Sequence, residues 1–197
     1  MDKLRYQLTL VLSLAPAACG GDRHAAGRAP AHVDSIVPQD VELARFREGL
    51  IEPTGLAGGV ATRDALVRSY VRELERADTA ALAALAITRA EFAYLYYPTT
   101  PEAHAPYDLG PGLMWFMVEQ NSRQGLLHAL ADRGGRSLGY VAYRCDPTPS
   151  RQGSNTVWGP CVVRHRQSGG DVIEEGLFAL IVERNGRFKF VSLANKL

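Results

Sequence analysis

Three cysteines are the residues of this chain whose type and position point most directly to chemistry. The first, Cys19, follows a segment in which Lys3 and Arg5 precede an apolar stretch over residues 8–14 and small residues at 17–18. That stretch is shorter than the ~20 residues that a helix needs to cross a bilayer. A basic, then apolar, then small-residue order is that of an export signal. We therefore expect residues 1–18 to be a cleaved signal peptide.

The residues before Cys19 also resemble the signal of bacterial lipoproteins, in which an aliphatic residue and small residues precede a cysteine. Here Pro16 stands where the aliphatic residue is usual. The resemblance implies a lipid on the Cys19 thiol and a membrane partner reached through that anchor, at the periplasmic face of the cell envelope. Because Gly20 and not Asp follows, it implies the outer membrane more than the inner one. The alternative is a secreted protein whose cysteine is incidental.

The other two cysteines, Cys145 and Cys161, form a pair once Cys19 is set apart. In an oxidising compartment such pairs usually join, so we predict a disulfide between them. Two buried free thiols are the alternative. A metal site is not expected, because His165 is the one histidine close to them in sequence and a second ligand is missing.

Length and charge favour one domain without a nucleic-acid partner. The chain has 197 residues, with 22 basic and 21 acidic side chains. This near-neutral balance gives no electrostatic reason to bind nucleic acid. We expect a flexible tether over 19–37, rich in Ala, Gly and Pro, a short helix and linker over 38–61, and a globular domain over 62–197.

Apolar spacing predicts helices in the first two thirds of the chain. Thr62 is a good N-cap, and Thr88 with Glu91 forms a capping-box pattern. The first predicted helix begins at Pro38. Three more are predicted over 62–74, 80–87 and 88–95. A stiff proline-rich loop follows, and the longest helix is predicted over 112–132. The candidate core residues of the longest helix are Leu113, Trp115, Phe116, Leu126, Leu127 and Leu130.

After residue 136 the pattern becomes that of strands. Asn185 and Gly186 are the strongest hairpin signal, because this dipeptide readily adopts the positive φ angles of a tight turn. The predicted strands cover 138–145, 157–166, 172–183 and 187–194. Helices followed by an antiparallel meander predict an α+β fold, with the N-terminal helices packed on one face of a curved antiparallel sheet.

Two segments resemble the nuclear transport factor 2-like, or SnoaL-like, fold. They are the helix junction over 76–82 (Arg-Ala-Asp-Thr-Ala-Ala-Leu) and the closing strand pair over 177–192. The resemblance covers 62–197 and implies a cone, in which the sheet curls around the helices and leaves an apolar cavity. Members use this cavity for isomerisation, hydrolysis, ligand binding or protein contact, so the fold leaves the function open.

An isomerase-like member of that family requires a carboxylate base and a tyrosine or protonated acid that face each other in the cavity. The candidates here are Asp108, Glu119, Asp132 and Glu174, with Tyr97, Tyr140 and Tyr143, and no spacing selects among them. Neighbouring Glu174 and Glu175 point to opposite faces of a strand, so at most one enters a cavity. We expect His104 and His165 to be exposed and His128 to be half-buried.

The leading hypothesis is a non-catalytic envelope domain that binds a small apolar ligand or another envelope protein. Tyr97, Trp115, Phe116 and Tyr143 are the residues expected to line its pocket, and core packing is the alternative for these aromatic side chains. The competing hypothesis is a SnoaL-like or isomerase-like enzyme that uses a cavity carboxylate and a tyrosine. The sequence contains no phosphate loop, nucleophile elbow or His-Glu-x-x-His motif, so neither a cofactor nor a metal is expected.

Overall fold

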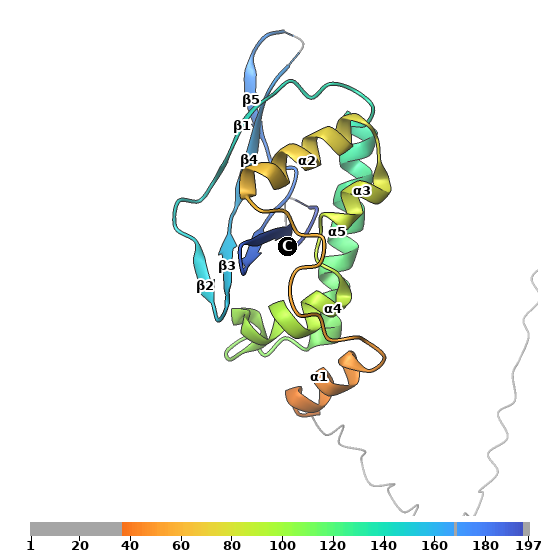
Figure 1. The fold of residues 1–197 in the computed structure, drawn as a ribbon, viewed down its shortest axis with the longest axis vertical. Helices are drawn as coiled ribbons and strands as arrows, with labels where there is room; N and C mark the ends of the chain where they lie inside the picture. The colour runs from red at the N-terminus through yellow and green to blue at the C-terminus, as the bar shows by residue number, and fades with distance from the viewer. Residues whose placement is uncertain (1–36, 168, 195–197) are drawn as a thin grey trace, which may run out of the picture. The chain divides into compact units, whose positions relative to one another are not determined.

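The computed structural model describes residues 37–167 and 169–194, which form the α+β fold that the sequence predicts (Figure 1). The helical elements are α1 (Gln39–Arg47), α2 (Arg63–Glu75), α3 (Thr79–Ala84), α4 (Arg89–Glu91), η1 (Phe92–Tyr96), η2 (Tyr97–Thr99), η3 (Pro101–Ala103) and α5 (Pro111–Arg133). The strands are β1 (Tyr140–Cys145), β2 (Ser150–Gln152), β3 (Asn155–Trp158), β4 (Cys161–Arg166), β5 (Val172–Glu175), β6 (Ile181–Arg184) and β7 (Arg187–Phe190). The predicted signal peptide and Cys19 lie outside the described residues.

The predicted helix starts are confirmed by their caps. The Thr62 hydroxyl accepts a hydrogen bond from the Ala65 amide at 3.1 Å, which satisfies a donor that the first turn of α2 leaves free. Thr88 and Glu91 form the complete capping box at α4. These short-range side-chain bonds fix where the chain turns from loop to helix, and they were readable from the sequence because they involve neighbouring residues.

The strands form two antiparallel sheets, in the orders β1-β4-β5 and β2-β3-β6-β7. The predictions of one strand over 157–166 and one over 172–183 are wrong. Each of these segments is two strands, β3 then β4 and β5 then β6, and each passes from one sheet to the other. In Figure 1 the strands lie on one side of the chain, and α2, α3 and α5 lie on the other.

Gly159 and Pro160 lie at the first of these two strand breaks. Proline has no amide hydrogen for a sheet ladder. A Cβ atom on Gly159 would lie 2.8 Å from the carbonyl oxygen of Ala179, which belongs to the second break. The two breaks therefore pack directly on each other, and only glycine fits at the contact.

The predicted disulfide is confirmed. Cys145 and Cys161 are joined, and they are directly paired at the end of the β1–β4 ladder. The loop that the bond closes contains the β2–β3 hairpin of the other sheet. The bond therefore limits how far the two sheets can separate.

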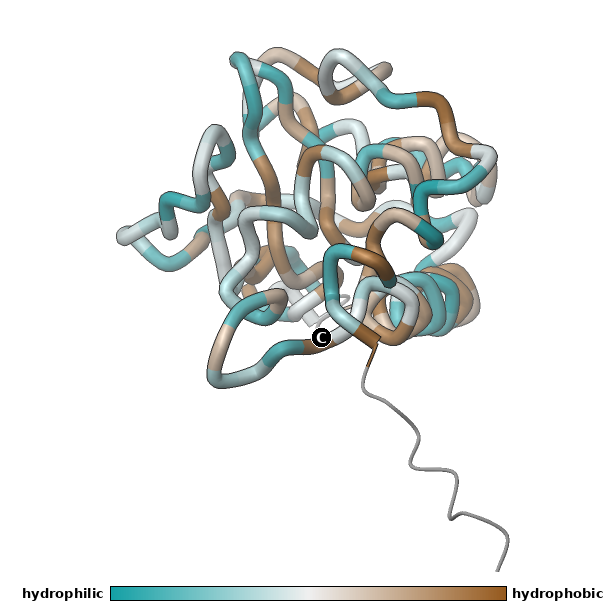
Figure 2. The backbone as a smooth tube through the Cα atoms, turned by 90° about the horizontal axis from the view of Figure 1, so that it is seen from below, coloured by the Kyte–Doolittle hydropathy of each residue, from teal (hydrophilic) through white to brown (hydrophobic). Residues whose placement is uncertain are grey.

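Two clusters of buried apolar side chains form the core. In one, the rings of Tyr70, Phe178 and Phe190 pack together with centroids 4.5 to 5.6 Å apart. In the other, Phe92 packs against Phe46 and Trp115. Figure 2 shows hydrophobic stretches of the backbone mostly in the interior of the domain and hydrophilic stretches at many of the outlying loops.

Helix α5 contributes to both clusters, but not with every residue that the sequence predicts. Leu126 is buried and Leu130 is partly buried, as expected. Leu113, Phe116 and Leu127 are wrong as core predictions, because each exposes more than half of its surface. The helix is apolar around most of its circumference, so periodicity alone did not select the face that packs. None of the helices in the described part of the chain is both long and apolar enough to cross a membrane.

Candidate functional sites

An apolar groove of about 540 Å³ runs between α5 and the α3–α4 segment. Its apolar wall includes Ala86, Ile87, Trp115, Val118, Leu126 and Val191. Charged side chains, Arg89, Glu119 and Arg123, also line it. A groove of this composition binds chiefly by removing apolar surface from water.

Trp115 lies in this groove because α5 is held close to the C-terminal segment. The Ser122 hydroxyl accepts a hydrogen bond from the Leu193 amide at 3.2 Å. A Cβ atom on Gly125 would lie 2.2 Å from the Leu193 carbonyl oxygen, so a side chain at this position would push the helix away. The indole ring of Trp115 packs on Phe92 at 5.2 Å between centroids, which fixes its orientation in the groove wall.

The other three predicted pocket residues lie elsewhere. Tyr97 is buried, and its hydroxyl donates to the Leu109 carbonyl and accepts from the Gln39 amide, both at 2.8 Å. It anchors the proline-rich loop. Phe116 is exposed on α5, and Tyr143 of β1 packs against the core cluster that contains Tyr70. The structure therefore places only Trp115 of the four in the wall of this groove.

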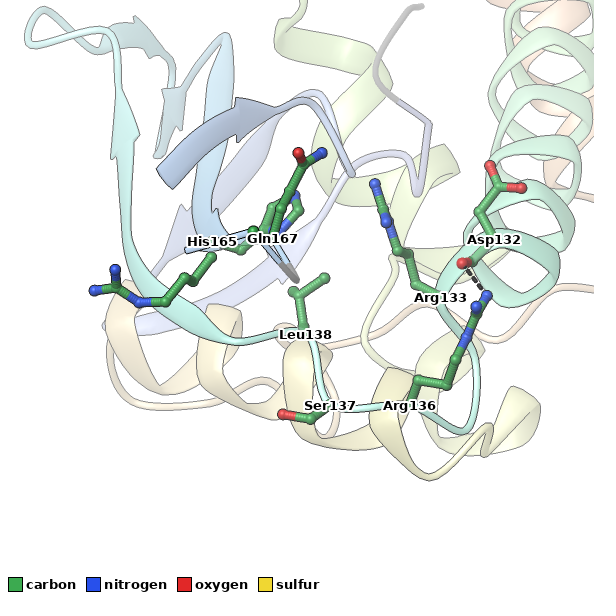
Figure 3. A pocket seen from close by; sticks show the side chains of 9 residues that line it. Asp132, Arg133, Arg136, Ser137, Leu138, His165 and Gln167 are labelled. Atoms are coloured by element: carbon green, nitrogen blue, oxygen red, sulfur yellow. Dashed lines mark hydrogen bonds between the residues drawn. The ribbon is translucent and has the colours of Figure 1, made fainter. Parts of the chain in front are cut away.

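A second, polar pocket of about 320 Å³ lies at the C-terminal end of α5 (Figure 3). Arg133 of α5 and Arg136 line one side of it, and His165 and Gln167 line the other. Arg136 donates a hydrogen bond to the main-chain oxygen of Asp132, which ties the segment after the helix to its last turn.

The polar pocket is built on a three-residue cluster. His165 Nε2 lies 2.7 Å from Glu175 Oε2, and a guanidinium nitrogen of Arg133 donates to the same oxygen at 3.0 Å. His165 is 2% exposed, and the Nε atom of Arg133 is buried without a hydrogen-bond partner among the described residues. The negative charge of Glu175 also acts on Tyr70, whose pKa is raised above its ordinary value, first by burial and second by this carboxylate.

The prediction that His165 is exposed is wrong. Along β4 the side chains alternate, so Cys161, Val163 and His165 are buried while Arg164 and Arg166 are exposed. The sequence contained this signal, because His165 shares the strand face of Val163 and of the disulfide cysteine.

The predicted carboxylates and tyrosines form no hydrogen-bonded pair in the described part of the chain, although Asp108 lies near enough to Tyr97 to help raise its pKa, after the larger effect of burial. No hydrogen bond within residues 37–167 and 169–194 joins Asp108, Glu119, Asp132 or Glu174 to Tyr97, Tyr140 or Tyr143. Glu174 pairs with Arg144 at 2.9 Å on the face opposite to that of Glu175, as strand alternation predicts. The pKa values of Tyr140 and Tyr143 are raised mainly by partial burial.

Two kinds of chemistry are open to these sites. The apolar groove can hold a nonpolar molecule, whereas a histidine held by a carboxylate, as at the polar pocket, is the arrangement of a general base. Within the described ranges, histidine, cysteine and acidic residues form no group of three that could hold a metal ion. A comparison with known protein families, curated proteins and solved structures finds no match to this chain.

Proposed function

We propose that the protein is a lipid-anchored envelope protein whose domain binds a small apolar molecule in the groove beside α5. The observation that carries this proposal is the groove itself, about 540 Å³ with Trp115 in an apolar wall. Ligand pockets of small molecules commonly have ~300–1,000 Å³ and mostly apolar walls. Burial of apolar surface contributes roughly 25 cal/mol per Å², so the ligand is mostly hydrocarbon and largely uncharged.

The anchor and the cone-shaped fold are parts of the same proposal. The pattern around Cys19 supports lipidation, and helices followed by antiparallel strands support a nuclear transport factor 2-like domain. Labelling of cells with a palmitate analogue tests the anchor, with Cys19→Ser as the control. A soluble, unlabelled product that begins after residue 17 or 18 would contradict lipidation.

The groove is tested by Trp fluorescence on titration with a steroid and with a medium-chain acyl amide. We expect either compound to quench or shift the emission, and Trp115→Phe to remove that response while Trp158 still fluoresces. Ala83→Phe fills the groove, whereas Ala80→Phe adds the same ring elsewhere on α3. Binding should therefore be lost in the first variant and kept in the second. No response to either compound would contradict this function and favour a protein partner.

A second function, general acid–base catalysis, is favoured by the 2.7 Å contact between His165 and Glu175 at the wall of the polar pocket. Glu175 would orient the imidazole, and His165 would move the proton of a small polar substrate. Hydrolysis of p-nitrophenyl acetate is a simple test. The rate should fall in His165→Gln but not in His104→Gln, which changes an exposed histidine. Equal rates in the two variants would contradict this function.

A further inference from the structure

One end of the domain carries a group of exposed apolar side chains that the proposed ligand groove does not use. We call this group the α5 face, and its members are Val41, Tyr107, Leu113, Phe116 and Met117. Their exposed fractions run from 37% for Val41 to 68% for Tyr107. Large apolar residues gathered in this way commonly mark a contact surface.

The α5 face lies where the chain enters the domain. Val37, the first residue that the structure describes, lines the same groove as Asp108 and Leu113. Tyr107 precedes Asp108, and Phe116 and Met117 follow Leu113 by one helical turn. Helix α1, which carries Val41, packs against α5. The entry point of the chain therefore lies beside Leu113, and the segments that carry the other four side chains are its neighbours.

We propose that the α5 face rests on the lipid bilayer to which Cys19 anchors the protein. This inference depends on the lipid anchor in the proposed function. Val37 lies eighteen positions after Cys19, and even a fully extended chain of that length spans only roughly 60 Å. The anchor thus confines the domain to a layer of that depth above the membrane, where even weak apolar contacts become effective and can set its orientation.

The chemistry of the α5 face fits a lipid surface. Tyrosine and phenylalanine are side chains that partition into the interface between water and hydrocarbon. The neighbouring helix α1 has two acidic residues in its first turn and two basic ones in its last, so it gives no net attraction to anionic lipid. The contact is therefore apolar, and it forms on zwitterionic lipid and persists at high salt.

The size of the α5 face favours lipid over a stable protein partner. From their exposed fractions, the five side chains offer on the order of 500 Å², less than the ~800 Å² that each partner contributes to a standard protein interface. A second copy of the chain bound through this face alone would be a weak dimer. For a domain already held by an anchor, a contact of this size is enough to set its orientation.

The test uses the full-length protein, reconstituted in phosphatidylcholine vesicles with brominated acyl chains, which quench nearby tryptophan. Phe116→Trp and Leu127→Trp are compared, each in a Trp115→Phe background. The two sites are matched, because both lie on α5 and are 56% and 55% exposed. They are about 16 Å apart along the helix axis.

We expect Phe116→Trp to lose about half of its emission on brominated lipid, and Leu127→Trp to remain at the level of the Trp158 background. Equal quenching at both sites, or none at either, in protein that floats with the vesicles would overturn the α5 face as the membrane contact and leave the anchor intact. A concentration-dependent dimer that protects Phe116→Trp from lipid would also overturn it. Protein that fails to float would refute the anchor, and with it this inference.

Discussion

Glu91 and Glu175 both accept hydrogen bonds from basic side chains, but they differ in how completely water is excluded. Glu91 is 1% exposed, and its two oxygens accept bonds from the amides of Ala57 and Thr88 and from the ammonium of Lys189. The Glu175 side chain is 28% exposed, and its contacts with Arg133 and His165 share one oxygen. The carboxylate of the first cluster is almost fully buried, whereas the second cluster borders two cavities.

The difference separates a structural role from a functional one. The Glu91 cluster connects the loop at Ala57, the capping box of α4 and strand β7 through hydrogen bonds within the protein. Its carboxylate and ammonium are almost fully buried, which leaves little room for a ligand. The Glu175 cluster leaves an imidazole and a guanidinium beside a polar pocket, so a small molecule or water can reach it. A buried charge that is hydrogen-bonded within the protein usually has a structural role, whereas a charge beside a cavity marks a candidate functional site.

The largest expected loss of stability comes from removing the Lys189 ammonium from the Glu91 cluster. Lys189→Met leaves the Glu91 carboxylate buried without its counter-ion, and we expect the free energy of unfolding to fall by about 3–5 kcal/mol. Urea unfolding measures this loss. The double variant Lys189→Met, Glu91→Gln also removes the unpaired carboxylate charge, so it should be more stable than Lys189→Met alone. A single-variant loss below about 1 kcal/mol would mean that water enters the cluster.

The next largest loss of stability is expected on removal of the disulfide, whose Cys161 lies on the same strand as His165. Replacing Cys145 and Cys161 by alanine releases a closure that spans 16 residues, and this should lower the free energy of unfolding by about 3 kcal/mol. The variant should still fold, because both core clusters remain. Thermal unfolding with and without reductant checks the same bond in the wild type, and an unchanged melting temperature would show that the bond contributes little.

Removal of the charge at Glu175 should cost less stability than removal of a charge from the Glu91 cluster. Glu175→Gln weakens the contacts to His165 and Arg133, but water can replace part of them, so we expect a loss of about 1–2 kcal/mol. Glu174→Gln is the matched control. That residue is adjacent, and its ion pair with Arg144 is exposed and worth roughly 0–1 kcal/mol. A Glu175→Gln loss as large as that of Lys189→Met would erase the distinction between the two clusters.

The smallest effect concerns a buried tyrosine that belongs to neither carboxylate cluster. Burial raises the pKa of Tyr96 to about 12, from 10.0. Because the folded-state pKa is the higher one, the stability that the neutral phenol contributes is complete below pH 10 and is lost as the pH rises through about 12. Tyr96→Phe should therefore reduce the loss of stability between pH 9 and 11 by about 1 kcal/mol, as measured by urea unfolding. An identical alkaline decline in both proteins would contradict this.

Much of the local structure was predictable because its causes are local. The caps at Thr62 and Thr88 involve residues three positions apart, and the hairpin turn at Asn185 and Gly186 depends on backbone preference. The disulfide was predictable because only two cysteines remained after Cys19 was set apart. The α+β class followed from the change of apolar period near residue 136.

The strand breaks and the polar site were not predicted. The segments 157–166 and 172–183 are rich in strand-forming residues, although Gly159, Pro160 and Gly176 are local break signals within them. That the two breaks pack on each other, Gly159 on Ala179, is a contact between distant parts of the chain. The Glu175 site requires Arg133, from the end of a helix, to approach β4 and β5. Its one sequence signal was the alternation along β4 that places His165 inside.

The sequence by itself thus determined where helices and turns begin, which residues could be bonded covalently, and the pattern at Cys19 from which export is expected. Only the tertiary structure decided which side of helix α5 is buried, why Gly125 lies in the middle of that helix, and which of two paired carboxylates borders a cavity. The physical reason is the separation along the chain of the residues that interact. Caps, turns and alternation act between neighbours, whereas burial of a charge or of a helix face depends on segments that are far apart in the chain and meet only when it folds.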